Sequence, residues 1–505
     1  MANGVESELK FVFSPHALPA VKAALGRENT SSTERHHLVS HYFDTADNFL
    51  WRRGATLRVR GEGPESKQTI KREQPSTLER DEYETEADGA TPNVGAFDAT
   101  PLAHLVRKPK VRRRLKQNFE VEVEREATTL DFNGSEIEAA VDLGEVRCKG
   151  ALAPFVELEL ELKSGEKKEL FELARRLCAA APIALNLISK AERGHLLVDG
   201  AWGRAFKGRP PEFSRRMNCA EAFQLVCHSC LHDFIVNLQA LERPDRVEAV
   251  HQGRVALRRL RAALQLFKPV VGGEDFQRID DELKWISHVF GEARDLDVFQ
   301  DNAFEPAAKS GDNPGAAALA RRTGAKRNQG HDAVNAAVAS LRLRRLLIDI
   351  SAWIEEGGWR RGESAQEPLG PFARRRLKEE LRKFVKRARD LAELDPAERH
   401  KVRIKAKKLR YMAGFFKTAP NLVSGRKALR RLLDRLERMQ DCLGELHDEQ
   451  TRAEFLAEEI RSLPAGADPL IGFAAGRLAQ PDGDPESKLS AALDAYRDVA
   501  RSRPF

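Results

Sequence analysis

Short strands with one charged face and one apolar face fill the chain up to about residue 205. In the stretch VESELK (5–10), Glu6, Glu8 and Lys10 share one face, because successive side chains of a strand point to opposite sides. The stretch VELELELK (156–163) repeats the pattern, with three glutamates and a lysine opposite Val and Leu. Turn residues separate these segments, which predicts a mostly antiparallel arrangement of strands.

The strands also separate acids from bases. The first and last strands carry carboxylates, whereas Arg58 and Arg60 in TLRVR and Lys71 in TIK lie between them. On a single strand, a charged face that meets water above an apolar core is the simpler interpretation. Here the apolar faces and several amphipathic helices indicate that the apolar side is itself covered, which favours a closed barrel with charge in its lumen.

A lumen lined with like charges needs counter-ions. Carboxylates would take a hard divalent cation such as Mg²⁺ or Mn²⁺, and the bases would take a polyanion. Together they predict metal-assisted chemistry on a phosphate chain.

The chain changes character near residue 205. After a linker at 206–216, long segments rich in Ala, Leu, Arg and Glu have helical periodicity. We therefore expect an α+β protein with a strand domain at 1–205 and an all-α domain at 217–505. Lys and Arg total 84 against 77 Asp and Glu, an excess too small to identify a partner without its distribution.

The helical part contains an internal repeat. HQGRVALRRLRAALQLF (251–267) matches HKVRIKAKKLRYMAGFF (400–416), and FGEARDLDVF (290–299) is echoed by LGELHDEQ (443–450). Two related helical bundles are expected, at about 217–345 and 370–505.

Each copy carries a basic ridge on one helix. Offsets of 0, 3, 7 and 10 residues fall within about 80° on a helix, and they hold His251, Arg254, Arg258 and Arg261 in the first copy and His400, Arg403, Lys407 and Arg410 in the second. A run of charge is commonly a solvated face, but its repetition favours a polyanion partner. With 5 Trp and 4 Tyr, base stacking has few platforms, so nucleic acid is not expected and a bare phosphate polymer is.

The strand part resembles the CYTH superfamily, the triphosphate tunnel metalloenzymes. The match rests on the E-x-E-x-K of residues 6–10 and on blocks in the same order, YFDT (42–45), LRVR (57–60), TIKRE (69–73), RDEYE (80–84), ELELK (159–163) and SKAERG (189–194). The resemblance implies an eight-stranded antiparallel tunnel with flanking helices, which hydrolyses or rearranges triphosphates.

It also implies roles for individual residues. The divalent metal would be held by Glu6, Glu8, Asp142, Glu159 and Glu161. The catalytic residues would be Glu6, Glu8 and Lys10, with one of the two glutamates orienting the attacking water. Phosphates would be bound by Lys10, Arg58, Arg60, Lys71, Arg80, Lys190 and one arginine of VRRRLK (111–116), for which we take Arg113.

The helical part resembles the CHAD domain, which is found with CYTH domains and associated with polyphosphate binding. H-x-x-R-V-x-x-R-R-L-R lies at 251–261 and G-x-x-R-D-L-D at 291–297. The second copy has His447 where the first has Arg294. The resemblance implies two four-helix bundles whose ridges line a groove, to which Arg294 and Lys408 also contribute.

We therefore expect an inorganic triphosphatase that binds long-chain polyphosphate through its helical part. The alternatives are a polyphosphate-granule scaffold without activity, or an enzyme that cyclises ATP or hydrolyses thiamine triphosphate. No stretch approaches the roughly 20 apolar residues of a membrane span, and no secretory signal is visible. The expected location is the cytoplasm, possibly at polyphosphate granules, and the sequence leaves the oligomeric state open.

Overall fold

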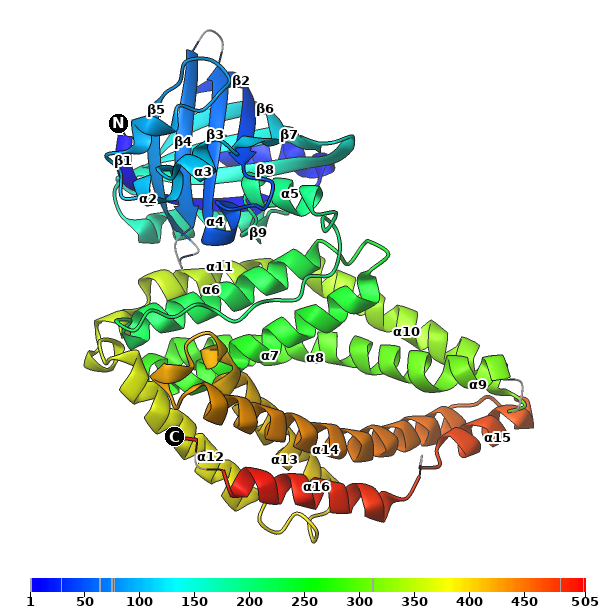
Figure 1. The fold of residues 1–505 in the computed structure, drawn as a ribbon. Helices are drawn as coiled ribbons and strands as arrows, with labels where there is room; N and C mark the ends of the chain where they lie inside the picture. Colours follow the sequence, from blue (N-terminus) through cyan, green and yellow to red (C-terminus); the bar gives the residue numbers. More distant parts are fainter. Residues whose placement is uncertain are drawn as a thin grey trace. The chain divides into compact units, whose positions relative to one another are not determined.

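The computed structural model describes residues 2–28, 30–62, 65–73, 76, 78–310, 313–481, 483–502 and 504–505. They form two compact units, shown in Figure 1. The barrel unit contains residues 1–206, 235–246 and 338–357, and the helical unit contains residues 207–234, 247–337 and 358–505. In the described residues, no helix is both long and apolar enough to cross a membrane.

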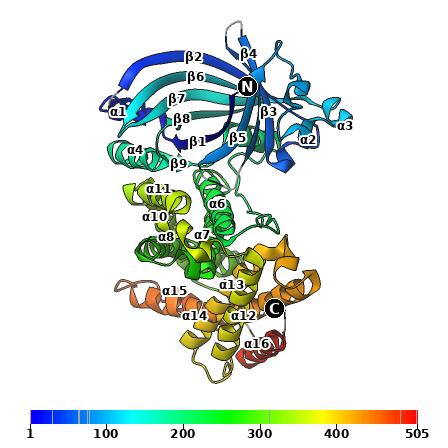
Figure 2. The ribbon, with the colours of Figure 1, turned by 90° about the vertical axis from the view of Figure 1, so that its left-hand side faces the viewer.

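Antiparallel strands form the body of the barrel unit. Their bounds are β1 (Ala2–Val12), β2 (Thr30–Asp44), β3 (Ala55–Glu62), β4 (Glu65–Glu73), β5 (Glu79–Glu86), β6 (Lys116–Phe132), β7 (Ser135–Cys148), β8 (Ala151–Ser164) and β9 (Ala184–Asn186). They pair in the order β5-β4-β3-β2-β6-β7-β8-β1-β9, and β5 also pairs with β1. This last pairing closes strands β1–β8 into a barrel, so the predicted eight-stranded antiparallel barrel is confirmed. Figure 2 shows β2, β6, β7, β8 and β1 following one another around its wall.

Helices cover part of the outside of the barrel. The unit contains α1 (Leu18–Leu25), α2 (Ala103–Val106), α3 (Pro109–Arg112), α4 (Lys167–Ala180), α5 (Lys190–Val198) and α11 (Leu341–Glu356). α4 packs on β1 and β8, where Leu9, Phe11, Leu158 and Leu160 are buried. These residues form the apolar faces of β1 and β8, the two strands whose opposite faces were predicted to carry carboxylates. Their charged faces therefore turn into the barrel.

The apolar side chains of β6 behave differently. Phe119, Val121 and Val123 lie in one buried cluster with Tyr42 and with Ala191 of α5. α5 itself packs against β6, β7 and β8. Ser189 caps this helix by accepting a hydrogen bond from the backbone N–H of Glu192, as the capping-box spacing predicts.

The helical unit contains the repeat. The helices that lie wholly or mostly in this unit are α6 (Cys219–Leu238), α7 (Arg246–Val271), α8 (Glu274–Phe299), α9 (Glu305–Ser310), α10 (Ala316–Ala339), α12 (Leu369–Arg387), α13 (Pro396–Gly414), α14 (Arg426–Arg461), α15 (Pro469–Leu478) and α16 (Pro485–Ala500). The last four residues of α6, the first residue of α7 and the last two residues of α10 belong to the barrel unit. α12, α13, α14 and α16 pack around one another as one bundle. In the other copy, Phe234 of α6 meets Phe290 of α8, and Asp297 of α8 pairs with His331 of α10.

The same contacts recur in the two copies. Arg254 of α7 pairs with Asp295 of α8 at 2.7 Å, and Arg403 of α13 pairs with Asp448 of α14 at 3.4 Å. Each arginine lies against a glycine of the longer helix, Gly291 or Gly444. The internal repeat of the sequence thus corresponds to two equivalent helix pairs, α7 with α8 and α13 with α14.

α11 belongs to the barrel unit although it lies far beyond the barrel strands in the sequence. The sequence-based boundaries assign everything after residue 216 to the helical domain, whereas α11 packs on α4 within the barrel unit. Arg175 of α4 pairs with Asp349 at 2.7 Å, and Arg344 donates to the carbonyl oxygen of Ala181 at 2.9 Å. A periodic helix gives no sign in its own sequence of which neighbour it will cover.

Candidate functional site

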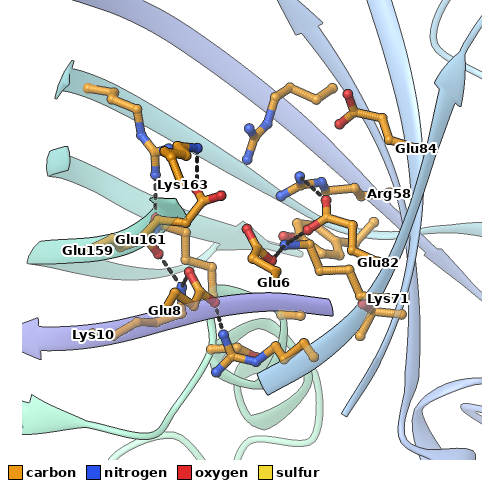
Figure 3. A pocket seen from close by; sticks show the side chains of 18 residues that line it. Glu6, Glu8, Lys10, Arg58, Lys71, Glu82, Glu84, Glu159, Glu161 and Lys163 are labelled. Carbon is orange, nitrogen blue, oxygen red and sulfur yellow. Dashed lines mark hydrogen bonds and ion pairs between the residues drawn. The ribbon is translucent and has the colours of Figure 1, made fainter. Parts of the chain in front are cut away.

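A cavity of about 590 Å³ opens inside the barrel (Figure 3). Its wall is almost entirely charged or polar. The side chains that line it are Glu6, Glu8, Lys10, Tyr42, Thr56, Arg58, Arg60, Lys71, Arg80, Glu82, Glu84, Arg125, Glu159, Glu161, Lys163, Ser189, Lys190 and Ala191. Tyr42 is the one aromatic residue among these lining residues.

Strand register brings the charges together. Lys10 of β1 stands opposite Glu159 of β8, and Glu6 stands opposite Arg80 of β5. On the other strands, Lys71 faces Glu82 and Arg125 faces Asp142. Residues opposite each other in an antiparallel pair have Cβ atoms about 5 Å apart, so each of these four pairs brings an acid to a base, whereas Glu8 stands opposite Glu161.

One set of carboxylates is neutralised by bases. Glu159 accepts from Lys10 at 2.5 Å, from Lys190 at 2.7 Å and from Arg125 at 2.5 Å. Burial opposes ionisation, but Lys10, Lys190 and Arg125 nevertheless hold the pKa of Glu159 well below its usual value.

Two more predicted metal ligands belong to the same set. Asp142 is fully buried and pairs with Arg125 at 2.7 Å and with Lys190 at 2.8 Å. Glu8 binds Lys10 through one oxygen and Arg80 through the other. With their oxygens engaged by cations, these acids orient the bases.

A second set of carboxylates has fewer cations. Lys71 lies 2.8 Å from Glu6 and 2.5 Å from Glu82, and in Figure 3 the side chains of Glu161, Glu6 and Glu82 point toward the same space. Burial raises the pKa of Glu82, and Glu6 adds to the rise. Burial likewise raises the pKa of Glu161, again with a contribution from Glu6. Mutual repulsion of this kind is relieved by a cation.

Glu6 itself stays ionised. Burial disfavours its charge, but Lys71 holds the pKa of Glu6 well below its ordinary value. Together Glu6, Glu82 and Glu161 supply the hard oxygen donors that Mg²⁺ and Mn²⁺ prefer, so the donor chemistry fits such an ion. Within the described ranges, no three His, Cys, Asp or Glu residues are already grouped as metal ligands.

Arg60 carries a charge with little compensation. Its Nε donates to Ser40 at 3.2 Å, and it forms no ion pair with any acid that the structure describes. Burial, together with the nearby guanidinium groups of Arg58 and Arg125, lowers the pKa of Arg60 to about 10. An anion in the cavity would stabilise this charge.

Most of the predicted tunnel residues line the cavity, with two exceptions. Asp142 lies behind the wall, with no exposed surface. Arg113 is exposed beside α3, outside the residues that line the cavity. The VRRRLK run forms a short helix and turn on the surface, so its charge is solvated.

Four charged lining residues were missed, namely Glu82, Glu84, Arg125 and Lys163. Arg125 follows Phe119, Val121 and Val123 on the inward face of β6, so the period-2 pattern alone assigns it to the interior. Glu82 shares a face with Arg80 in RDEYE, which was a sufficient signal to include it.

Other acids lie elsewhere. Glu157 is fully buried and pairs with Arg193, so it is not a solvated charge at the mouth. Glu120, Glu122 and Glu124 lie on the outer face of β6, where Glu122 meets His37 at 2.9 Å. They alternate with the buried valines of the same strand.

A second cavity, of about 760 Å³, lies in the helical unit. It is lined by both basic ridges and contains all but one of the residues predicted to bind polyphosphate, namely His251, Arg254, Arg258, Arg261, Arg294, His400, Arg403, Lys407 and Lys408. Arg410 lies outside it, lines a neighbouring cavity and pairs with Glu437 at 2.8 Å. We call the cavity that contains the two ridges the basic groove.

Cations crowd in the basic groove. Burial, together with the charges of Arg258 and Arg403, lowers the pKa of Lys407 to about 7. Burial and Arg254 lower the pKa of Arg258. The acids Asp295 and Asp448 are each 54% exposed, so they compensate this charge weakly.

The chain thus joins two kinds of domain, a closed barrel with a charge-lined cavity and a repeated helical unit with a basic groove. The CYTH domain family matches residues 5–195 and the CHAD domain family matches residues 226–457. The chain thus carries a CYTH domain followed by a CHAD domain.

Two known proteins illustrate the similarity. An inorganic triphosphatase of Haemophilus influenzae is 28% identical over 202 residues, which cover 38% of this chain and 54% of that protein. The chain therefore matches about half the length of this curated relative. The crystal structure of the CHAD domain from the plant Ricinus communis superposes with a TM-score of 0.51 at 27% identity, covering 59% of this chain and 97% of that domain.

Proposed function

We propose that the barrel unit hydrolyses inorganic triphosphate with the help of Mg²⁺ or Mn²⁺. The observation that carries this proposal is a cavity in which six bases from four strands and one helix surround carboxylates with raised pKa, beside a single aromatic side chain; the bases are Arg58, Arg60, Lys71, Arg80, Arg125 and Lys190. The name of the Haemophilus influenzae relative supports the same activity.

The bases bind and orient the phosphate chain. Arg60, with no carboxylate partner among the described acids, is the one most available to a phosphate oxygen. Arg125 and Lys10 are fixed by Glu159, so they meet the substrate in a preset geometry. Donors held in place before the reaction stabilise the charge that develops on the transferred phosphoryl group.

The metal would be held by Glu6, Glu82 and Glu161. A divalent cation bound there supplies charge neutralisation for the phosphate oxygens. Glu8, Asp142 and Glu159, which we expected to bind it, act instead as positioning residues for the bases they neutralise.

Glu6 is the residue that orients the attacking water. It is ionised at neutral pH, so it can accept a hydrogen bond. Both oxygens of Glu8 are engaged by Lys10 and Arg80, which leaves it unsuited to the same role.

The helical unit binds long-chain polyphosphate along the basic groove. A polymer of phosphate supplies the negative charge that the ridges lack and needs no aromatic platform. We extend the proposal to a cytoplasmic location at polyphosphate granules.

The hydrolysis proposal is tested with a substrate panel. Tripolyphosphate, long-chain polyphosphate, ATP and thiamine triphosphate are each incubated with the full chain and Mg²⁺ or Mn²⁺, and phosphate release is measured. Tripolyphosphate should be the preferred substrate, with turnover abolished by a chelator. Turnover of an organic triphosphate alone would redirect the proposal to that substrate, and no turnover at all would leave a binding scaffold.

The groove proposal is tested by charge reversal. Replacing Arg254, Arg258, Arg403 and Lys407 together by Glu should abolish polyphosphate binding in a filter or calorimetric assay while tripolyphosphate hydrolysis continues. Undiminished affinity would disprove the groove as the binding site. Arg430→Glu, at a surface position outside the basic groove, is the matched control.

A further inference from the structure

The two copies of the repeat differ at one position of the basic groove. In the first copy, the helix opposite His251 carries Arg294, whereas the second copy has His447 opposite His400. The rings of His400 and His447 lie with their centroids 3.8 Å apart. Where the first copy has a histidine beside a permanent cation, the second has two imidazole rings in close contact, tilted by 39° to each other.

Charged groups of α13, α7 and α8 surround the His400–His447 pair. From its own helix, His400 has Arg403 and Lys407 beside it, and α7 contributes Arg258 and α8 contributes Asp295. His447 faces His400, Arg403, Lys407 and Asp295, with Asp448 next to it in the sequence and the Thr451 hydroxyl 3.4 Å from its Nε2. The nearby charges are therefore mainly positive.

Among the described residues, Asp295 is the acid that partly compensates a charge on these rings. The Nδ1 atom of His400 is buried and has no hydrogen-bond partner there. Burial, together with His400 and Arg403, lowers the pKa of His447 to about 4. Burial and Arg403 also lower the pKa of His400. In the empty groove at neutral pH, both rings are neutral.

We propose that the His400–His447 pair forms a proton-gated half of the basic groove, which gains charge as it receives an anion, while the half with His251 keeps the permanent cation of Arg294 at any pH. The inference rests on the proposed polyphosphate binding and names its regulation. Phosphate oxygens beside the rings replace cationic neighbours with anionic ones, so binding draws protons onto the pair. Each proton gained on binding makes the affinity rise about tenfold per pH unit as the pH falls between the free and the bound pKa.

The test exchanges the two residues that differ. Affinity for long-chain polyphosphate, whose internal phosphates stay ionised, is measured from pH 8 to pH 5.5 at constant ionic strength with a chelator present. For the unaltered chain the dissociation constant should fall more than tenfold over this range. Lys407, whose pKa is about 7, titrates in the unaltered chain and in every variant, so differences between them report on the exchanged position.

The two exchanges should act in opposite directions. His447→Arg should bind more tightly at pH 8 and lose up to about one logarithmic unit of slope per pH unit, because one titrating group is gone. Arg294→His should bind more weakly at pH 8 and gain slope. His447→Gln, which adds no bulk or charge, should lose slope without binding more tightly at pH 8.

The outcomes separate this inference from the proposed function. Salt-sensitive binding with the same pH slope in the unaltered chain and in all three variants would overturn the inference and leave the groove proposal intact. Absence of binding at every pH would overturn both. A slope lost in His447→Gln and in His447→Arg supports the inference even if Arg294→His fails to fold.

Discussion

The cavity of the barrel and the basic groove both gather cations, but they balance them differently. In the barrel, strand register puts an acid opposite Lys10, Lys71, Arg80 and Arg125, and Glu159 alone meets three cations. In the groove, helical periodicity repeats the bases along one face, and the nearest acids are half exposed. Most cations of the first site are thus neutralised within it, whereas the second keeps a repulsion that a polyanion would relieve.

The strongest test of this contrast compares two arginines within the barrel. Arg60→Gln and Arg125→Gln should each reduce tripolyphosphate hydrolysis by about 100- to 1,000-fold, as the loss of one donor to a developing charge does. They should differ in stability. Arg125→Gln leaves Asp142 and Glu159 short of a buried partner and should cost about 3–5 kcal/mol, while Arg60→Gln removes an unpaired charge and should not lower the melting temperature.

Equal destabilisation by the two substitutions would contradict the distinction between paired and unpaired bases. Arg35→Gln, on the exposed part of β2, is the control for both measurements.

Salt should separate the two sites. Raising the salt concentration from about 50 to 200 mM should weaken polyphosphate binding about 100-fold or more, because each phosphate contact releases counter-ions. The KM for tripolyphosphate should change much less, because charges within an enclosed wall are screened less than exposed ones. Parallel titrations of binding and hydrolysis check this, and equal salt slopes would argue against the contrast.

Repulsion in the groove should be visible in its stability. The pKa of Lys407 in the folded protein is about 7, below its ordinary value of 10.5. Between these values the unfolded chain binds a proton that the folded chain does not, so the wild type loses stability as the pH falls from 10.5 to 7 and the loss levels off below. Lys407→Met should therefore melt a few degrees higher than wild type at pH 7, with a smaller gap at pH 10.

Thermal melts at the two pH values check this prediction. A gap that is the same at both would mean that apolar packing by Met, and not removal of charge, accounts for it. Lys405→Met, at an exposed position of the same helix, is the control.

The smallest effect is expected on the outside of the barrel. Glu122→Gln removes a carboxylate that meets His37 and Arg147 at the surface. Metal affinity and hydrolysis should stay unchanged, and the melting temperature should move by no more than about 1 °C, because exposed pairs contribute little. A loss of metal affinity would instead indicate that Glu122 contributes to a metal site.

The sequence predicted different features of the two units, because strands and helices have different side-chain periods. Alternation along β1 and β8 was sufficient for a closed barrel and an acidic interior, because a face is determined by position alone. It could not say which acids remain available to a metal. That follows from register, which sets Arg125 opposite Asp142 and leaves Glu6, Glu82 and Glu161 with fewer cations.

In the helical unit the limit was different. Offsets on α7 and α13 were sufficient to predict the ridges, and the repeat was sufficient to predict that they occur twice. The contact between the rings of His400 and His447 depends on the angle at which α13 meets α14, which the pattern of a single helix does not contain.

The packing of α11 bears on how this protein can be divided. A gene fragment that ends at residue 206 would encode every strand of the barrel and yet omit the helix that covers α4, together with the partners of Arg175, Ser76 and the carbonyl oxygen of Ala181. Such a fragment would expose the surface of α4 that α11 covers in the full chain. Poor solubility of the fragment would therefore reflect this exposed surface and would not be evidence against activity of the barrel. The part of the chain needed to fold the barrel unit therefore extends to α11, well beyond the strands that enclose the cavity.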